Sequence, residues 1–296
     1  MNHVYTFYDL FLSVPFPCPM LTPAPAGAAP DVEVVEGEVP GHLAEAIVEG
    51  SNWQAAPGRF LFRAGRFSGR FLVESGERIT LQRNPAARDE RLCAHLLAAV
   101  TAALLRQRGL LVLHANVVTT QRGAVAITGV SGAGKSTAQA ALMARGCRMV
   151  TDDITAIRMR ADGCIMAIPG VHKMNLCEDA AEKFGHDIAV LPRNPLRRAK
   201  VLVPVALGDT LHEPIPLKAI YHLDSHPGEG ITVTRLAGTE KFAALQGCIY
   251  GPLFPQEHHG LFPLVSAVAA QVDIIRIERP AGRWSANEVV EAILHG

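Results

Sequence analysis

The sequence has few of the features that mark a secreted, metal-clustered or membrane-spanning protein. Only six cysteines occur in 296 residues, with no C-x-x-C pair and no regular spacing, so a disulfide framework is excluded and a reducing cytoplasm is the expected compartment. The twelve histidines are scattered, and none has companions at the spacing of a metal-ligand cluster. The longest apolar runs, such as LLAAVTAALL, fall short of the roughly 20 residues that a membrane span requires.

Excess charge is also lacking. The 28 Lys and Arg residues balance 28 Asp and Glu residues, which gives no bulk attraction for nucleic acid or for an anionic membrane surface. Neither is therefore expected as a partner. Apolar residues, by contrast, make up 49% of the chain, which is enough for one sizeable core and a smaller appendage.

The sequence pattern changes near residue 88. Residues 1–88 contain short strand patterns separated by Gly, Asn-Pro and a Pro-rich connection, and they predict a small, mostly antiparallel, β-rich N-terminal domain. Residues 89–108 (DERLCAHLLAAVTAALLRQR) then have helical periodicity, with acid at the start and base at the end. We therefore expect a second domain over residues 89–296.

This second region has the pattern of an α/β core. Dense apolar runs of strand length (LLVLHANVV, GAVAIT, CRMVT, GCIMAI) enclose a helix that begins at Lys135. Near-continuous apolar strands indicate a sheet covered on both faces. Further strands are expected at KVLVPVAL, KAIYHLD, ITVTRL and VDIIRIER. A final helix is expected at SANEVVEAILHG, with Ser285 and Glu288 forming a capping box.

The segment GVSGAGKST, residues 129–137, predicts a phosphate-binding loop. It satisfies G-x-x-x-x-G-K-[ST], follows an apolar strand and opens a helix. The glycines let backbone N–H groups converge on phosphate oxygens, and the helix N-terminus adds partial positive charge. Lys135 supplies a charge at the outer phosphates, and Ser136 offers a hydroxyl to Mg²⁺. The residues expected to bind ATP are Gly129, Ser131, Gly132, Ala133, Gly134, Lys135, Ser136 and Thr137.

Two aspartates end the next strand pattern, CRMVTDD. If this strand lies parallel beside the strand before the loop, Asp152 and Asp153 reach the sheet edge where the phosphates bind. One carboxylate can then hold Mg²⁺ while the other accepts the proton of an attacking hydroxyl. A solvated turn after the strand is the alternative, because Asp is common in turns.

The segment from His114 to Ile157 resembles the catalytic domain of HPr kinase/phosphorylase. It has that family's histidine-containing strand, its G-x-S-G-x-G-K-S loop and its R-G-x-x-x-V-x-D-D segment in the same order. The resemblance implies a mixed α/β sheet of P-loop kinase type, related to phosphoenolpyruvate carboxykinase, that uses ATP and Mg²⁺ and assembles as a homo-oligomer. It also implies three residue roles: Asp152 as general base toward a serine hydroxyl, Asp153 as a metal-site carboxylate, and His114 as the histidine that keeps the base ionised. Without the resemblance, a lone histidine in an apolar strand is more often a core residue.

The departures from this family bear on the substrate. Thr137 stands where the family has Glu, and Ala167 and Pro169 stand where a downstream signature has its acid and its Arg. These differences argue against reversible dephosphorylation and against HPr itself as the acceptor. The N-terminal strands resemble those of HPr-kinase-related proteins found beside ribosomal-peptide biosynthesis genes, where lasso-peptide tailoring kinases phosphorylate a serine of the precursor.

Basic residues after the aspartates are candidates for contacting the transferred phosphate. PGVHKMNL contains Lys173, and RNPLRRAK contains Arg197 and Lys200. Such side chains can neutralise the charge of a phosphoryl group in transfer or bind an acidic peptide. A run of bases on a loop is equally often a solvated face.

The sequence thus predicts a cytoplasmic, Mg²⁺- and ATP-dependent kinase that phosphorylates a serine of a peptide or small protein, with a ribosomal (lasso) precursor peptide as the expected acceptor. Three alternatives stay open: an authentic HPr serine kinase/phosphorylase, a nucleotide-binding regulatory protein that transfers nothing, and a small-molecule kinase.

Overall fold

The computed structural model describes residues 2–251 and 255–296. The chain divides into two compact units. The first comprises Met1–Leu111, Pro195–Arg197 and Gly251–Leu261, and the second comprises Val112–Asn194, Arg198–Tyr250 and Phe262–Gly296. The main division falls after Leu111, whereas the sequence predicted a boundary after residue 88.

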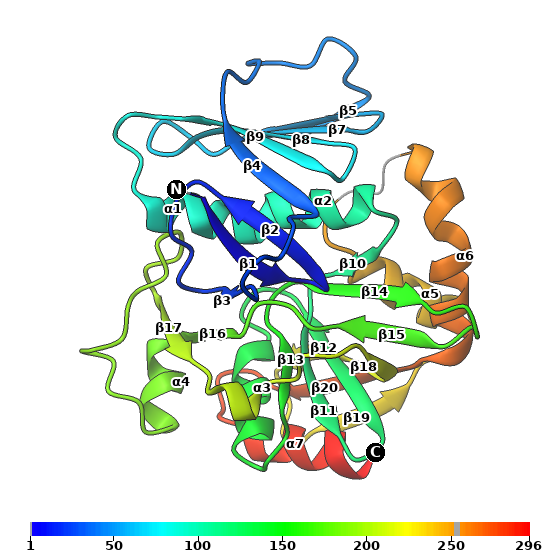
Figure 1. Ribbon diagram of the computed structural model, residues 1–296. Helices are drawn as coiled ribbons and strands as arrows, with labels where there is room; N and C mark the ends of the chain where they lie inside the picture. The colour runs from blue at the N-terminus through cyan, green and yellow to red at the C-terminus, as the bar shows by residue number, and fades with distance from the viewer. Residues whose placement is uncertain (1, 252–254) are drawn as a thin grey trace. The chain divides into compact units, whose positions relative to one another are not determined.

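The first unit is built on a nine-stranded sheet (Figure 1). Its order is β3-β1-β2-β4-β9-β8-β7-β6-β5, and its pairs are antiparallel except β2–β4 and β4–β9, which are parallel. The strands are β1 (His3–Phe7), β2 (Leu10–Val14), β3 (Thr22–Pro23), β4 (Val32–Glu36), β5 (Val48–Glu49), β6 (Trp53–Ala56), β7 (Arg59–Arg63), β8 (Gly69–Glu74) and β9 (Arg78–Arg83). Three of these strands were not predicted: β3, which lies in the expected Pro-rich connection, β5, which is very short, and β6, which lacks β-branched residues.

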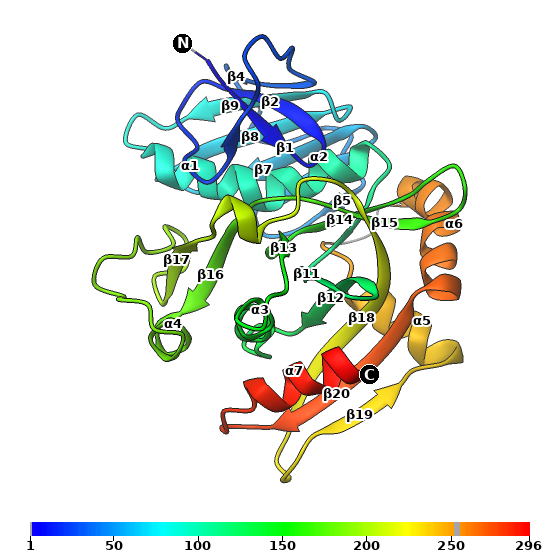
Figure 2. The same ribbon diagram turned by 60° about the horizontal axis from the view of Figure 1, so that its bottom comes forward.

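The helix expected over residues 89–108 forms, with one irregularity. It consists of α1 (Asp89–His95), a π-helical turn (Leu96–Val100) and α2 (Thr101–Gln107). Figure 2 shows the whole helix lying along one face of the first sheet. At its end, Gln107 Nε2 donates to Val73 O and Arg108 Nη1 donates to Gly76 O. These contacts with β8 and the turn after it explain why the helix belongs to the first unit.

The second unit contains a mixed nine-stranded sheet. Its main order is β10-β14-β15-β18-β12-β11-β13, and β20 pairs with β18 and β19. Its strands are β10 (Leu111–Leu113), β11 (Asn116–Thr120), β12 (Gly123–Gly129), β13 (Met149–Thr151), β14 (Thr155–Met159), β15 (Ile165–Ile168), β18 (Ile215–His226), β19 (Thr232–Arg235) and β20 (Asp273–Pro280). Because β12, β18 and β20 are parallel, their carboxyl ends lie at one edge of the sheet.

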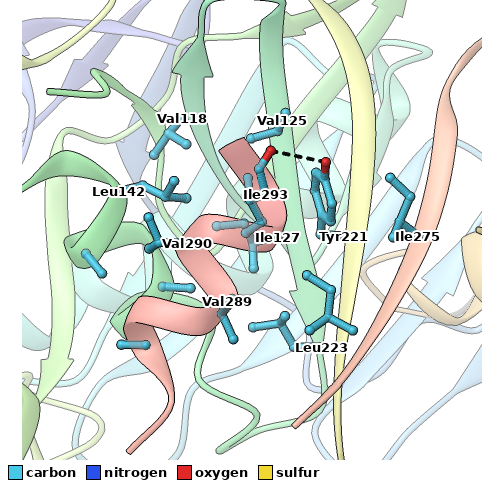
Figure 3. Packing of buried hydrophobic residues seen from close by; sticks show 14 of the residues in the cluster. Val118, Val125, Ile127, Leu142, Tyr221, Leu223, Ile275, Val289, Val290 and Ile293 are labelled. Carbon is cyan, nitrogen blue, oxygen red and sulfur yellow. Dashed lines mark hydrogen bonds between the residues drawn. The ribbon is translucent and has the colours of Figure 1, made fainter. Parts of the chain in front are cut away.

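Two helices cover one face of the β12–β18–β20 region. They are α3 (Lys135–Met143), which begins at the predicted residue, and α7 (Ala286–His295). Figure 3 shows the resulting core, in which Leu142 of α3 and Val289 and Ile293 of α7 pack against Ile127 and Tyr221 of the sheet. The predicted capping box of α7 is wrong: among the described residues, Ser285 makes no side-chain cap hydrogen bond, and Glu288 instead pairs with Arg283 at 2.8 Å.

A two-stranded antiparallel sheet with a long connection, the β16–β17 hairpin, packs against α3. It consists of β16 (Lys173–Cys177) and β17 (Lys200–Pro204), with α4 (Glu178–Lys183) following β16. Met174, Leu176 and Val203 of the hairpin bury their side chains in a cluster that includes Ala140 of α3. The remaining elements are a 3-10 turn (Leu207–Asp209), α5 (Gly238–Gly247) and α6 (Pro255–Gln271). Across residues 2–251 and 255–296, none of the helices has both the length and the apolar character needed to span a membrane.

Candidate active site

The phosphate loop connects β12 to α3, as the sequence predicts. Gly129, Gly132 and Gly134 have φ angles of 139°, 87° and 101°, which side chains with a Cβ rarely adopt. A Cβ on Gly129 would also lie only 2.4 Å from the Leu223 carbonyl oxygen. Glycine therefore lets the loop leave β12 directly beside β18 and turn into α3. The N-terminus of a helix that opens in this way can bind an anion through its free N–H groups.

Lys135 lies inside this loop. It is buried, and its Nζ donates to the carbonyl oxygens of Gly129 at 2.7 Å and Val130 at 3.3 Å. Ser136 follows in the first turn of α3 and is half-buried. A buried ammonium group above a glycine-rich turn and a helix N-terminus is the arrangement that binds nucleotide phosphates, so the residues fit a triphosphate chemically.

Arg279 is a site residue that the sequence analysis missed. It lies near the end of β20, and its Nε donates to Ala133 O at 2.8 Å while its Nη2 donates to Gly132 O at 3.2 Å. These bonds tie two carbonyl groups of the phosphate loop to the sheet. The strand itself was predicted, but only the parallel arrangement of β12, β18 and β20 brings its carboxyl end to the loop.

Asp152 is buried, and both of its carboxylate oxygens accept hydrogen bonds from amide groups. It is only 5% exposed. Its Oδ1 accepts from Asn116 Nδ2 at 2.5 Å, and its Oδ2 accepts from both the backbone N and the Nδ2 of Asn175, each at 2.9 Å. Asn194 Nδ2 in turn donates to Asn175 Oδ1 at 2.6 Å. Neither Asn116 nor Asn175 stood out in the sequence, because their role depends on contacts between distant segments.

The surroundings of Asp152 give it an unusual proton affinity. Burial, and secondarily the neighbouring Asp153 charge, raise the pKa of Asp152 to about 7. The hydrogen bonds from Asn175 and the positive charge of Lys200 lower this pKa and so partly offset the rise. A carboxyl group with a pKa near neutrality is suited to accept a proton from a substrate at physiological pH.

Asp153 occupies a different environment. Its φ of 68° lies in the left-handed region, and its side chain is 34% exposed. His114 Nδ1 approaches Asp153 Oδ1 at 3.5 Å, while the His114 ring meets Tyr250 edge-on at 5.6 Å. The resemblance gave His114 the role of keeping Asp152 ionised, and the structure places its Nδ1 beside the following residue, Asp153.

The local backbone explains this placement of His114. The sequence predicted one continuous strand at LLVLHANVV, whereas the structure has β10 ending at Leu113 and β11 starting at Asn116. His114 lies in the break, where its backbone N donates to Cys248 O at 2.7 Å. The break turns the histidine toward Asp153, and Asn116, the first residue of β11, contacts Asp152.

The aspartates are linked to α3, the helix after the phosphate loop, in a way that differs from the predicted neighbouring parallel strands. Their strand, β13, runs in the same direction as β12 but is separated from it by β11, which is antiparallel to both. Gln139 of α3 spans the gap: its Nε2 donates to Thr151 O at 2.8 Å, and its Oε1 accepts from Asn116 Nδ2 at 2.7 Å. Asn116 donates to both Gln139 and Asp152, and it thus links the helix after the phosphate loop to the buried carboxyl group.

The three basic candidates are not all brought together. Lys173 and Lys200 lie on the β16–β17 hairpin that also carries Asn175, and the charge of Lys200 acts on Asp152. Alternation along the strand places Lys173 on the same face as Asn175. Arg197 is counted with the first unit. Among the described residues, no three His, Cys, Asp or Glu side chains converge on a common metal position.

Comparisons of the sequence with protein-family profiles and with curated proteins find no match. Among solved structures, the chain is similar to the HPr(Ser) kinase/phosphatase from Coxiella burnetii, with 16% sequence identity and a TM-score of 0.32. The similarity covers 62% of this chain and 87% of that chain. At this identity and TM-score it carries no conclusion about function, which rests on the residues of the site.

Proposed function

We propose that this protein is a kinase that transfers the γ-phosphoryl group of ATP to a serine hydroxyl of a peptide or small protein. The observation that carries the proposal is the buried Asp152, which is joined through Asn116 and Gln139 to the helix that opens at the phosphate loop. Burial, which raises the pKa of Asp152 to about 7, supports the same role. This pairing of a neutral-pH proton acceptor with a phosphate cradle is what transfer to an alcohol requires.

In this proposal the loop Gly129–Ser136 binds the ATP phosphates through its backbone N–H groups and through Lys135. Ser136 Oγ and the half-exposed Asp153 carboxylate are the oxygen donors that would hold Mg²⁺, an ion that usually keeps several waters and phosphate oxygens in its coordination shell. When bound, Mg²⁺ supplies charge neutralisation to the phosphates. His114 orients Asp153 through their 3.5 Å approach.

Asp152 takes the proton of the acceptor serine. The serine oxygen forms a bond to the γ-phosphorus, the bond from the γ-phosphorus to the bridging oxygen breaks, and ADP leaves with that oxygen. Asn116 and Asn175 fill three of the about four acceptor positions of this carboxylate. The acceptor hydroxyl donates either to the position left on Oδ1 or to Oδ2 after the Asn175 side-chain amide has moved aside.

Lys173 and Lys200 give the acceptor side of the site a positive character. Both lie on the hairpin that would meet the acceptor, and Arg197, in the segment that precedes β17 in the sequence, is kept as a third candidate. Together they favour a peptide with acidic residues near its serine. We propose a ribosomal precursor peptide of the lasso type as the acceptor class, and a homo-oligomer as the assembly.

The test is intact-mass analysis of candidate acceptors after incubation with ATP and Mg²⁺. A lasso-type precursor peptide is expected to gain phosphate mass on serine, while purified HPr and a peptide with its serines replaced by alanine stay unmodified. Phosphorylation of HPr alone would make the protein an HPr kinase. ATP binding without any modified acceptor in any of these mixtures would contradict the kinase proposal and favour a nucleotide-binding regulator.

A further inference from the structure

A cavity lies in the second unit, away from the phosphate loop. Its volume is about 680 Å³, within the range of small-molecule sites. It is lined by residues from the first halves of β12, β18 and β20, by the β11–β12 turn, and by the last residues of α7. The phosphate loop follows the opposite, carboxyl end of β12, so the two sites occupy opposite edges of the same sheet.

The floor of this cavity is apolar. Val125, Tyr221, Ile275 and Ile293 contribute to its lining, and Figure 3 shows these four side chains close together where α7 meets the sheet. The one polar group among them is already used, since the Tyr221 hydroxyl donates to Ile293 O at 3.3 Å. A ligand that lies on this floor must therefore present an apolar body.

The mouth of the cavity is cationic. Arg122, Arg145, Lys218 and Arg235 line it, against a single carboxylate side chain in the lining, Asp273. Three of the four cations have partners: Arg235 pairs with Asp273, Arg145 pairs with Glu291 at 2.8 Å, and Arg122 donates to Gly296 O.

Lys218 differs from the other three. No carboxylate within the described part of the chain forms a salt bridge with it, and it is exposed. Gly123 allows its side chain to cross the start of β12, because a Cβ there would lie 2.8 Å from Lys218 Cγ. The cavity thus has an unneutralised ammonium group at its edge and three guanidinium groups around it.

We propose that this cavity binds a small organic anion with an apolar body, such as a medium-chain carboxylate. The carboxylate lies at the mouth between Lys218 and Arg122, and the hydrocarbon chain lies on the floor formed by Tyr221 and Ile275. The positive charges at the mouth favour an anionic head group. The four floor residues described offer no free polar group, so they favour a hydrocarbon tail. The site is independent of the kinase proposal, since it uses none of the residues assigned to ATP or to the acceptor.

The test is isothermal titration of the full-length protein with octanoate, alongside acetate and 1-octanol as probes of the head group and the tail alone. Octanoate is expected to bind saturably at one site, and each of the two partial probes to bind at least tenfold more weakly. Lys218→Gln and Arg122→Gln, made separately, are each expected to weaken octanoate binding about tenfold, as the loss of a charged hydrogen bond does.

Arg160→Gln is the matched control, because Arg160 is an exposed arginine of the same unit that pairs with Asp162 and does not line the cavity. It is expected to leave octanoate binding unchanged. The proposal is overturned if octanoate does not bind the unaltered protein, if 1-octanol binds as tightly as octanoate, or if both cavity variants bind like the control.

Discussion

Asn175 donates two hydrogen bonds to the same oxygen of Asp152, one from its backbone N and one from its side-chain amide, both at 2.9 Å. Asn116 holds the other oxygen. A buried carboxyl group that is engaged on both oxygens is positioned tightly, yet one of its bonds comes from a side chain on a hairpin. Asn116 and Asn175 thus hold the Asp152 carboxyl group in place, and in the proposed mechanism the Asn175 side chain limits access to Oδ2.

The first prediction concerns the pH dependence of transfer in Asn175→Ala. The hydrogen bonds from Asn175 lower the pKa of Asp152, so losing the side-chain bond raises this pKa above its value of about 7. Less of the carboxylate is then ionised at neutral pH. The acid limb of kcat/KM against pH is expected to move upward by about one unit, the equivalent of one hydrogen bond to a charged group.

Asn194→Ala provides the graded comparison, because Asn194 contacts Asn175 rather than Asp152. Its acid limb is expected to move less than that of Asn175→Ala. A limb that stays in place in both variants would show that Asp152 is not the group whose ionisation controls the rate.

The second prediction concerns Arg279. Its guanidinium holds the Gly132 and Ala133 carbonyl groups, so Arg279→Ala is expected to loosen the phosphate loop and weaken ATP binding about tenfold, with Arg279→Lys recovering part of the loss. Titration with a fluorescent ATP analogue measures the dissociation constant. Arg276→Ala, on the same strand, is the control because Arg276 faces Glu240 at 4.0 Å. Equal affinities in all three variants would remove Arg279 from the site.

The third prediction concerns stability in mild acid. Burial lowers the pKa of His95 in the first unit and of His172 in the second to about 4 each, against about 6.5 in an unfolded chain. The unfolded state therefore binds protons that the folded state does not, so the free energy of unfolding is expected to fall as pH drops from about 6.5 to about 4.

Urea unfolding at a series of pH values measures this dependence. A His172→Gln variant is expected to lose less stability on acidification than the unaltered protein, since one of the two proton-linked groups is gone. His295→Gln is the control, because His295 is an exposed residue that pairs with Glu291. Parallel stability curves for all three proteins would contradict the assignment of His172.

Part of this structure could be predicted from patterns of neighbouring residues in the sequence. The phosphate loop, the helix from Lys135 and the strands around them follow from glycine spacing and apolar periodicity, which act over a few residues. The aspartate pair after β13 was found in the same way. These features depend little on which strand lies beside which.

The remaining features depend on tertiary topology. Asn116, Asn175 and Arg279 come from β11, β16 and β20, and only the sheet order and the hairpin bring them to the loop and to Asp152. The resemblance gave His114 the role of keeping Asp152 ionised, and the structure places it in the break after Leu113, 3.5 Å from Asp153. The π-helical turn at Leu96–Val100 likewise has no signature in the helical periodicity of residues 89–108.

The central claim is that Asp152 accepts the proton during phosphoryl transfer, and Asp152→Asn tests it most directly. Asparagine keeps the size of the side chain but cannot take up a proton, so transfer to the acceptor peptide is expected to fall by about 10²–10⁴-fold while the dissociation constant for ATP changes little. Asp162→Asn, on an exposed turn where Asp162 pairs with Arg160, controls for the substitution itself. The decisive measurement is the rate of phosphate incorporation by intact mass, with ATP affinity measured on the same samples. A large loss in Asp152→Asn alone, at unchanged ATP affinity, is the predicted result, and full transfer activity in Asp152→Asn would contradict the account.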